Sequence, residues 1–209
     1  TLERKDGRHV VFRDYFGNHV LKPPKENFMT PSVDIIKSQI RFLDGRAMPW
    51  ASKVNHLCYN REYIDSVSVI ASAYAARGHK VLVVSNRVHF LKTCSQLVGD
   101  IAVHVTGDMD FAEREKTINK LKNDKNVLFG TQSIFSEGIS IDELSCLILA
   151  TPINNEPLLT QLIGRILRKK EDKMQPVVVD INLKGNTASR QNSARLGYYM
   201  KQGYSVREL

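Results

Sequence analysis

The sequence predicts an α/β fold in which a parallel β-sheet carries helices on both faces. Short apolar runs rich in β-branched residues alternate along the chain with amphipathic stretches of helical period. The apolar runs are continuous rather than alternating, as expected for strands buried on both faces, and the connections between segments are short. Repeated alternation of this kind favours parallel strands joined by right-handed helical crossovers.

The composition favours a globular protein with an anionic partner. The 209 residues carry a formal net charge of +8, with 42% hydrophobic and 25% charged residues. No apolar run approaches the roughly 20 residues that cross a bilayer, and the charged start lacks the apolar core of a signal peptide. Three scattered cysteines exclude a disulfide framework, and the histidines show no metal-binding spacing. We expect a monomer in a reducing, cytoplasmic setting without membrane contact, and a nuclear location is left open.

The first 60 residues give the weakest pattern. Residues 9–16 predict a short helix ended by Gly17, and Pro23-Pro24 predicts a loop. Residues 33–42 suit a strand followed by irregular structure. The role of residues 24–60 stays open, with an edge strand and a connector as the working interpretation.

From Asn60 onward the signals are sharper. A helix is predicted between Asn60 and Gly78. Asn60 is its predicted N-cap, Glu62 suits the positive end of the helix dipole, and Gly78 ends the helix. The elements that follow are predicted as strands at 81–84, 101–105, 127–129, 147–150 and 177–181, and helices at 88–98, 111–121, 157–168 and 188–202.

Polar residues follow four of the predicted strands. Ligands of parallel α/β sheets bind at the carboxyl ends of the strands, and hydroxyls, amides and backbone N–H groups hold phosphates without reading bases. The residues at these strand ends are Ser85, Asn86 and Arg87, then Thr106, Gly107 and Asp108, then Thr131, Gln132 and Ser133, and finally Thr151. An ordinary loop explains any one of them equally well, but four along one edge favour a nucleic-acid backbone track. No aromatic series interleaves with the basic residues, so base stacking is not predicted.

The stretch Gln161-Leu162-Ile163-Gly164-Arg165-Ile166-Leu167-Arg168 is the most informative one. As a helix it would place Gln161, Arg165 and Arg168 on one side. Arginine stays charged and offers a planar fork of donors that matches phosphate oxygens. A solvated basic face is the commoner explanation of an isolated Arg-x-x-Arg. The choice between such a face and a phosphate-binding site therefore depends on the rest of the chain.

In this order the blocks resemble the second RecA-like domain of superfamily 2 helicases and translocases. Residues 81–87 resemble motif IV and its polar exit, residues 104–107 the element after it, residues 127–138 motif V, and residues 161–168 motif VI. The resemblance covers residues 80–181 well and extends more weakly to the start of the chain. The run Gly138-Ile139-Ser140-Ile141 is similar to phage UvsW-like helicases.

The resemblance implies a role for each block. Motif VI implies that Arg168 is an arginine finger on the γ-phosphate of ATP, that Arg165 supports it, and that Gln161 positions them or the attacking water. Motif V implies that Glu137 and Gly138 face the nucleotide. Ser140 stands where many relatives carry an Asp that contacts the nucleotide ribose. The nucleic-acid contacts implied are those of Ser85, Asn86, Arg87, Thr106, Gly107, Thr131 and Gln132.

The resemblance implies that this chain carries only half of an ATP site. No phosphate-binding Gly-x-x-x-x-Gly-Lys-Ser/Thr loop occurs, and Asp142-Glu143 lies before a strand rather than at the end of one. The resemblance therefore implies that ATP and Mg²⁺ are bound mainly by a preceding N-terminal RecA-like domain of the same protein. Residues 1–60 would join that domain and add edge elements, and residues 61–209 would form the C-terminal RecA-like domain, which alone should hydrolyse ATP hardly at all.

The leading hypothesis is thus the C-terminal motor domain of an ATP-dependent superfamily 2 helicase or translocase, acting on DNA rather than RNA. One alternative is a nucleic-acid-binding module that keeps the fold without motor activity. Another is the translocase part of a restriction or nuclease system, whose nuclease residues would lie outside this chain.

Overall fold

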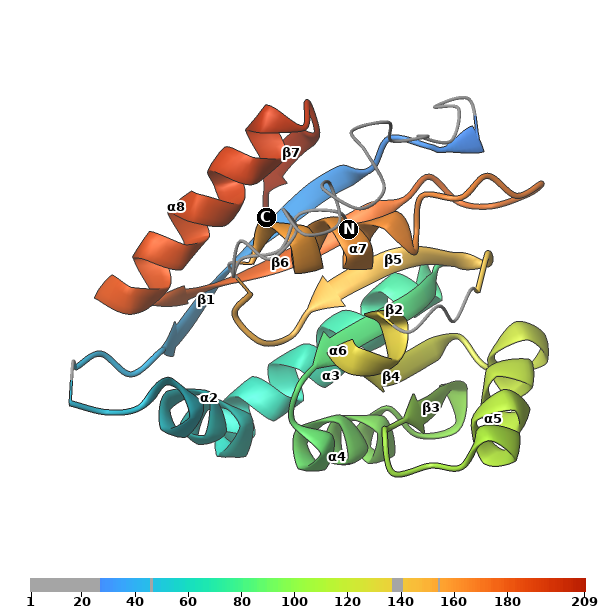
Figure 1. The fold of residues 1–209 in the computed structure, drawn as a ribbon, viewed down its shortest axis with the longest axis horizontal. Coiled ribbons are helices and arrows are strands. Elements are labelled where there is room, and N and C mark those ends of the chain that lie inside the picture. Colours follow the sequence, from blue (N-terminus) through green and yellow to red (C-terminus); the bar gives the residue numbers. More distant parts are fainter. Residues whose placement is uncertain (1–26, 46, 137–140, 154) are drawn as a thin grey trace, which may run out of the picture.

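The computed structural model describes residues 27–45, 47–136, 141–153 and 155–209. They form a seven-stranded sheet in the order β3-β4-β2-β5-β6-β1-β7, in which every pair of neighbours is parallel (Figure 1). The predicted fold class is therefore confirmed. The helix expected at 9–16 and the loop at Pro23-Pro24 lie outside the described residues.

The central strands are the continuous apolar runs of the sequence. β2, β4 and β5 are buried along almost their whole length, because helices cover both of their faces. The strands are β1 (Ser32–Arg41), β2 (Lys80–Ser85), β3 (Ala102–Val105), β4 (Val127–Thr131), β5 (Leu144–Leu149), β6 (Val177–Lys184) and β7 (Ser205–Glu208).

Three of the helices begin at side-chain caps that the sequence supplies. The side-chain oxygens of Asn60, Asp110 and Asn155 each accept a hydrogen bond from a backbone N–H three residues later, at 2.9, 2.7 and 3.3 Å. The helices are α2 (Trp50–Tyr59), α3 (Arg61–Ala76), α4 (Val88–Val98), α5 (Phe111–Asn123), α6 (Gln132–Ser136), α7 (Glu156–Gly164) and α8 (Asn186–Lys201).

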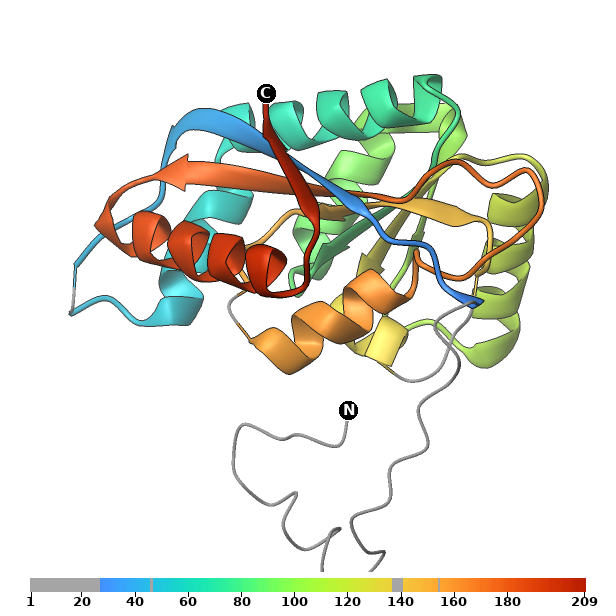
Figure 2. The ribbon, with the colours of Figure 1, turned by 90° about the horizontal axis from the view of Figure 1, so that it is seen from above.

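The sheet separates two hydrophobic cores (Figure 2). Successive side chains of β2 alternate between them: Val81 and Val83 pack with α2, α3 and α4, whereas Leu82 and Val84 pack with α5, α7 and the end of α8. Helices therefore cover both faces, as the apolar strands predict.

The weakly patterned N-terminal stretch supplies an inner strand. β1 lies between β6 and β7, and Val33, Asp34 and Ile35 are buried. The carboxylate of Asp34 accepts hydrogen bonds from the Tyr74 hydroxyl and the Arg207 guanidinium, so β7 is tied to β1 by charge as well as by backbone bonds. The connector expected after β1 contains α2. Its N-cap is Pro49, so the helix begins without a side-chain cap that could be recognised in the sequence.

A buried ion pair fastens α8 to the sheet. The guanidinium of Arg195 donates to both carboxylate oxygens of Asp180 at 2.7 and 2.8 Å, and the Tyr199 hydroxyl donates to the same carboxylate at 2.8 Å. Asp180 and Arg195 are 2% and 3% exposed. Burial alone would lower the pKa of Arg195, but the charge of Asp180 and its hydrogen bonds raise it, so the arginine stays charged.

Candidate functional site

The polar strand ends lie in one row at the carboxyl edge of the sheet. Strands β3, β4, β2 and β5 are consecutive neighbours, and Ser85 pairs directly with Thr131 across β2 and β4. Thr106 follows β3 on one side of this pair, and Thr151 follows β5 on the other. The expectation that these residues share one edge is confirmed.

Their hydroxyls face inward. Ser85, Thr106, Thr131 and Thr151 are 0%, 0%, 7% and 2% exposed. The Ser85 hydroxyl accepts a hydrogen bond from the Arg87 backbone N–H at 3.2 Å, and the Gln132 side-chain amide donates to Thr151 at 3.5 Å. The Ser85 and Thr151 hydroxyls thus help to hold the strand-end turns in shape. The exposed members of the row are Asn86, Gly107, Asp108 and Ser133, and Arg87 and Gln132 are half-buried.

Helix α2 positions Arg87. The Arg87 guanidinium donates to the Asn55 side-chain oxygen and, at 3.3 Å, to the Ala51 carbonyl oxygen, both on α2. It also donates to the Asn86 carbonyl oxygen at 3.3 Å. Arg87 is therefore fixed beside the end of β2 by a helix that the sequence did not signal.

Motif VI departs from the expected helix. α7 ends at Gly164, and the backbone N–H groups of Arg165 and Ile166 donate to carbonyl oxygens three residues earlier, at 3.1 and 3.0 Å. The Leu167 carbonyl oxygen then accepts a bond from the Met29 N–H at 2.7 Å, and Arg168 forms an antiparallel bridge with Phe28. The helix predicted over 157–168 is confirmed over residues 157–164, but its extension to Arg168 is wrong.

Two causes account for this ending. Gly164 lowers helix propensity, and the pairing of residues 167–169 with residues 27–29 competes with further helical turns. Gln161 and Arg165 still lie one turn apart, but Arg168 lies beyond the helix, so helical periodicity does not set its position.

The two arginines influence each other electrostatically. Burial lowers the pKa of the half-buried Arg165, and the positive charge of Arg168 lowers it further. Both remain cations, because a guanidinium does not lose its proton in proteins. Arg168 donates to the carboxylate of Asp142 at 3.2 Å, and these side chains are 44% and 50% exposed. An ion pair this exposed is weak and can be exchanged for a stronger anionic ligand.

Charged side chains around the turn hold it in place. The Lys173 ammonium donates to the Arg168 carbonyl oxygen at 2.8 Å, and Lys170 forms an ion pair with Glu143. Burial lowers the pKa of Lys173 to about 8, although Asp142 and Glu143 oppose the shift. Lys170 and Lys173 also line a cavity of about 220 Å³ at the start of β2 and β5.

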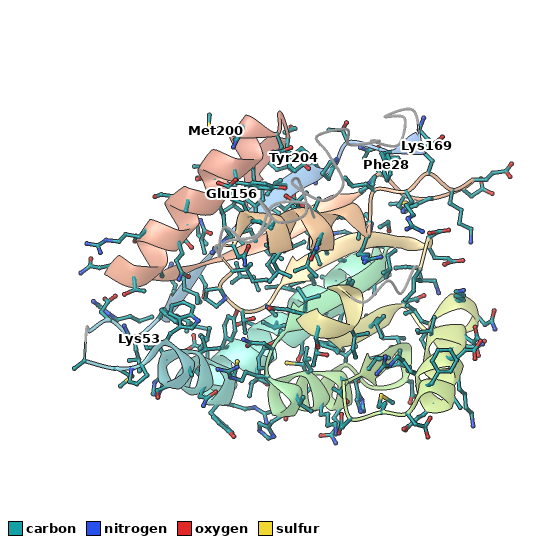
Figure 3. The ribbon with its side chains drawn as sticks, viewed as in Figure 1. Phe28, Lys53, Glu156, Lys169, Met200 and Tyr204 are labelled. Atoms are coloured by element: carbon teal, nitrogen blue, oxygen red, sulfur yellow. The ribbon has the colours of Figure 1, made fainter. Side chains whose placement is uncertain are left out.

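The two groups of residues lie at opposite edges of the sheet. Arg168 bridges to Phe28 just before β1 begins, and its partner Asp142 precedes β5, so both belong to the amino edge. Figure 3 shows Phe28 and Lys169 side by side at one end of the molecule and Lys53, which follows the end of β1, at the other. Of the proposed nucleotide-facing residues, Glu137, Gly138 and Ser140 lie outside the described residues.

Three further observations concern the part of the chain that the structure describes. Within it, no three or more His, Cys, Asp or Glu residues gather closely enough to hold a metal ion. Nor does any described helix combine the length and the apolar character needed to span a membrane. The three cysteines are buried as free thiols.

The comparisons with known proteins agree with this architecture. Residues 62–170 match the family model described as the helicase conserved C-terminal domain. The probable helicase D10 of Escherichia phage T5 is 38% identical over 210 residues, which cover 99% of this chain and 47% of the relative. The chain thus spans about half the length of this curated relative.

Solved structures show the same fold at low sequence identity. The crystal structure of T4 UvsW matches 85% of this chain and 41% of its own chain, with a TM-score of 0.67 and 18% identity. The structure of S. cerevisiae Dbp5 bound to RNA and ADP BeF3 matches all of this chain and 50% of its own, with a TM-score of 0.67 and 12% identity. Together with the family match, the geometry identifies the chain as a member of the helicase conserved C-terminal domain family, the second RecA-like domain of superfamily 2 helicases.

Proposed function

We propose that this chain is the C-terminal motor domain of an ATP-dependent helicase or translocase and completes an ATP site held by an N-terminal RecA-like domain of the same protein. The observation that carries the proposal is the pair of arginines at the end of α7. The positive charge of Arg168 lowers the pKa of Arg165, and the ion pair of Arg168 with Asp142 is exposed to water. Such a pair suits a polyphosphate better than a structural role.

Arg168 is the proposed arginine finger and Arg165 the supporting contact. Phosphoryl transfer spreads negative charge over the equatorial oxygens, so a cation placed against the γ-phosphate stabilises the transition state. Arg168 would exchange the Asp142 carboxylate for the phosphate, since the bond to Asp142 is exposed to water. Gln161, one turn before Arg165 on α7, would position the arginines or the attacking water.

ATP and Mg²⁺ are proposed to be held mainly by the N-terminal domain. The described residues offer no metal-ligand cluster, and the sequence contains no phosphate-binding loop. Glu137, Gly138 and Ser140 are proposed to face the nucleotide from this side. Dbp5, whose fold this chain shares, is described with both RNA and ADP BeF3 bound, which supports a site for each kind of ligand on this architecture.

The carboxyl edge is the proposed nucleic-acid track, with DNA expected and RNA as the alternative. Backbone N–H groups and the exposed side chains near Asn86, Gly107 and Gln132 would contact phosphates, so sequence preference should be low. The net charge of +8 supports an anionic partner. α6 begins directly after β4 at this edge and packs against α7, so the proposed track and the arginines are mechanically connected.

The decisive test is Arg168→Ala in the full-length protein. We expect nucleic-acid-stimulated ATP hydrolysis to fall by about 10³- to 10⁵-fold, while nucleic-acid affinity is retained. Arg61→Ala is the matched control, because Arg61 is an exposed arginine on α3, which covers the opposite face of the sheet. Unchanged turnover in the Arg168 variant would show that Arg168 takes no part in ATP hydrolysis. The chain would then be better described as a nucleic-acid-binding module without motor activity.

A further inference from the structure

Exposed aromatic side chains stand on segments that adjoin the proposed track. Among the described residues Phe111 is the most exposed large hydrophobic side chain, at 78%, and Tyr59 is 67% exposed. The Tyr59 ring stacks on the imidazole of His89, with 5.0 Å between the ring centroids and 30° between the planes. His89 is exposed as well. These rings are far apart in the sequence, so only the fold brings them to one edge.

The stacked pair lies beside the end of β2. Tyr59 is the last residue of α2, and Asn55, one turn earlier, accepts the hydrogen bond from Arg87. His89 is in the first turn of α4, directly after the Asn86-Arg87 turn. The contact that fixes Arg87 therefore also fixes the position of the rings.

Phe111 lies at the other end of the same stretch of edge. It is the first residue of α5, three positions after Asp108, which follows β3. Lys92, one turn after His89 on α4, donates to the Asp108 carboxylate at 3.4 Å and so links α4 to the turn that precedes Phe111. Only β4 separates β3 from β2, so the two strand ends are about 10 Å apart.

We propose that Tyr59, His89 and Phe111 form a base-stacking surface along the track, so that the carboxyl edge binds a single strand whose bases are unpaired. The inference rests on the proposed function, which places nucleic-acid phosphates at this edge. A groove that tracks the backbone, combined with aromatic rings on which bases stack, is the way proteins hold single strands without reading sequence. In a duplex the faces of the bases are covered by their neighbours, so these rings would have no partner there.

The ligand chemistry is therefore an unpaired base next to a phosphate. The Tyr59–His89 stack leaves much of the Tyr59 ring uncovered, and Phe111 is uncovered over most of its surface. Each of the two rings can take one base, with the exposed backbone near Asn86 and Gly107 holding the phosphates between them.

The test compares a normal single strand of DNA with an abasic strand of equal length, using fluorescence anisotropy and the full-length protein over a salt series. We expect Phe111→Ala and Tyr59→Ala each to weaken binding of the normal strand by about 5- to 150-fold. The slope of log affinity against log salt should stay unchanged, because no phosphate contact is lost. The abasic strand should bind the wild-type protein and both variants alike.

Two conservative variants and one remote variant complete the design. Phe111→Trp and Tyr59→Phe keep an aromatic ring and should retain affinity. Met200→Ala removes an apolar side chain that is 69% exposed on α8 and should change nothing. Arg87→Ala should weaken both strands and reduce the slope by about 0.7, as expected for one lost phosphate contact on a single strand.

The outcomes separate the inference from the proposed function. If the wild-type protein shows no salt-dependent binding of either strand, the proposed track fails, and the stacking surface fails with it. If the wild-type protein binds with a salt slope but the two alanine variants match it, the track stands and the inference is overturned. Equal losses on the normal and abasic strands would overturn it too, since the rings would then act without bases.

Discussion

At the carboxyl edge of the sheet the hydroxyl side chains of Ser85, Thr106, Thr131 and Thr151 are buried, whereas at the amino edge Arg168 of motif VI forms an exposed ion pair. Ser85 and Thr131 are paired across neighbouring strands and buried, so the register of the sheet fixes them. Arg168 follows a helix end and is held by a bridge to Phe28 and by an exposed bond to Asp142. The first arrangement presents a rigid row of backbone groups, and the second presents a cation whose partner can be exchanged.

The largest effect that tests this contrast is expected from Arg168→Lys. Lysine keeps the charge but lacks the planar fork that binds two phosphate oxygens at once. We expect most of the 10³- to 10⁵-fold loss in stimulated ATP hydrolysis attributed to an arginine finger, with nucleic-acid affinity unchanged. Steady-state turnover and binding of a labelled strand at one fixed salt concentration measure both. A lysine variant with full turnover would show that charge alone is sufficient and that the fork geometry is not used.

The next prediction concerns stability and compares the buried pair Arg195–Asp180 with the exposed pair Arg168–Asp142. Asp180→Ala should lower the free energy of unfolding by about 3–5 kcal/mol, because it leaves the buried Arg195 without a counter-charge. Asp142→Ala should cost at most about 1 kcal/mol, because Arg168 and Asp142 are exposed. Chemical denaturation of the two variants checks the difference. Similar losses would mean that Arg168 is held as firmly as Arg195, against the idea of an exchangeable partner.

The sequence predicts the parts of the fold that depend on local chemistry. The apolar runs of β2, β4 and β5 and the cap at Asn60 are local signals, and the structure has the corresponding elements. α2 was missed because it begins after Pro49 without a side-chain cap, and β7 because four mostly exposed residues carry no apolar pattern.

The site depends more on contacts between distant residues. The row of strand ends could be predicted, because parallel strands always end at a common edge. The position at which α7 ends could not be predicted from the sequence, because it depends on the pairing of residues 27–29 with the distant residues 167–169. For the same reason Tyr59, His89 and Phe111 gave no signal: three separate elements, α2, α4 and α5, bring them to one edge.

Gly164 allows a smaller and more selective test of the amino edge. A Cβ added there would meet no atom of the described chain within 4 Å beyond its chain neighbours and the backbone of its own helix, so Gly164→Ala should leave stability unchanged or raise it by up to about 1 kcal/mol through helix propensity. If the N-terminal domain approaches this helix end during ATP hydrolysis, the added methyl group should lower turnover without changing nucleic-acid affinity. Leu196→Ala on α8 is a suitable surface control. Unchanged turnover in the glycine variant would place the domain contact elsewhere.

The smallest expected effect is a pH dependence of stability that is confined to the amino edge. Burial lowers the pKa of Lys173 to about 8 from its ordinary value of 10.5, so the unfolded chain binds more protons between these two values. Stability should therefore rise as the pH increases from about 8 toward 10, because deprotonation relieves the cost of burying the charge. The gain should stay below about 1 kcal/mol, since the side chain is only half-buried and water screens it. In Lys173→Gln this component of the rise should disappear from denaturation curves measured across that range, while variants at the carboxyl edge, such as Asn86→Ala, should keep it. A rise that persists unchanged in the Lys173 variant would assign the titration to another group and leave the Arg168 turn without a pH-sensitive contact.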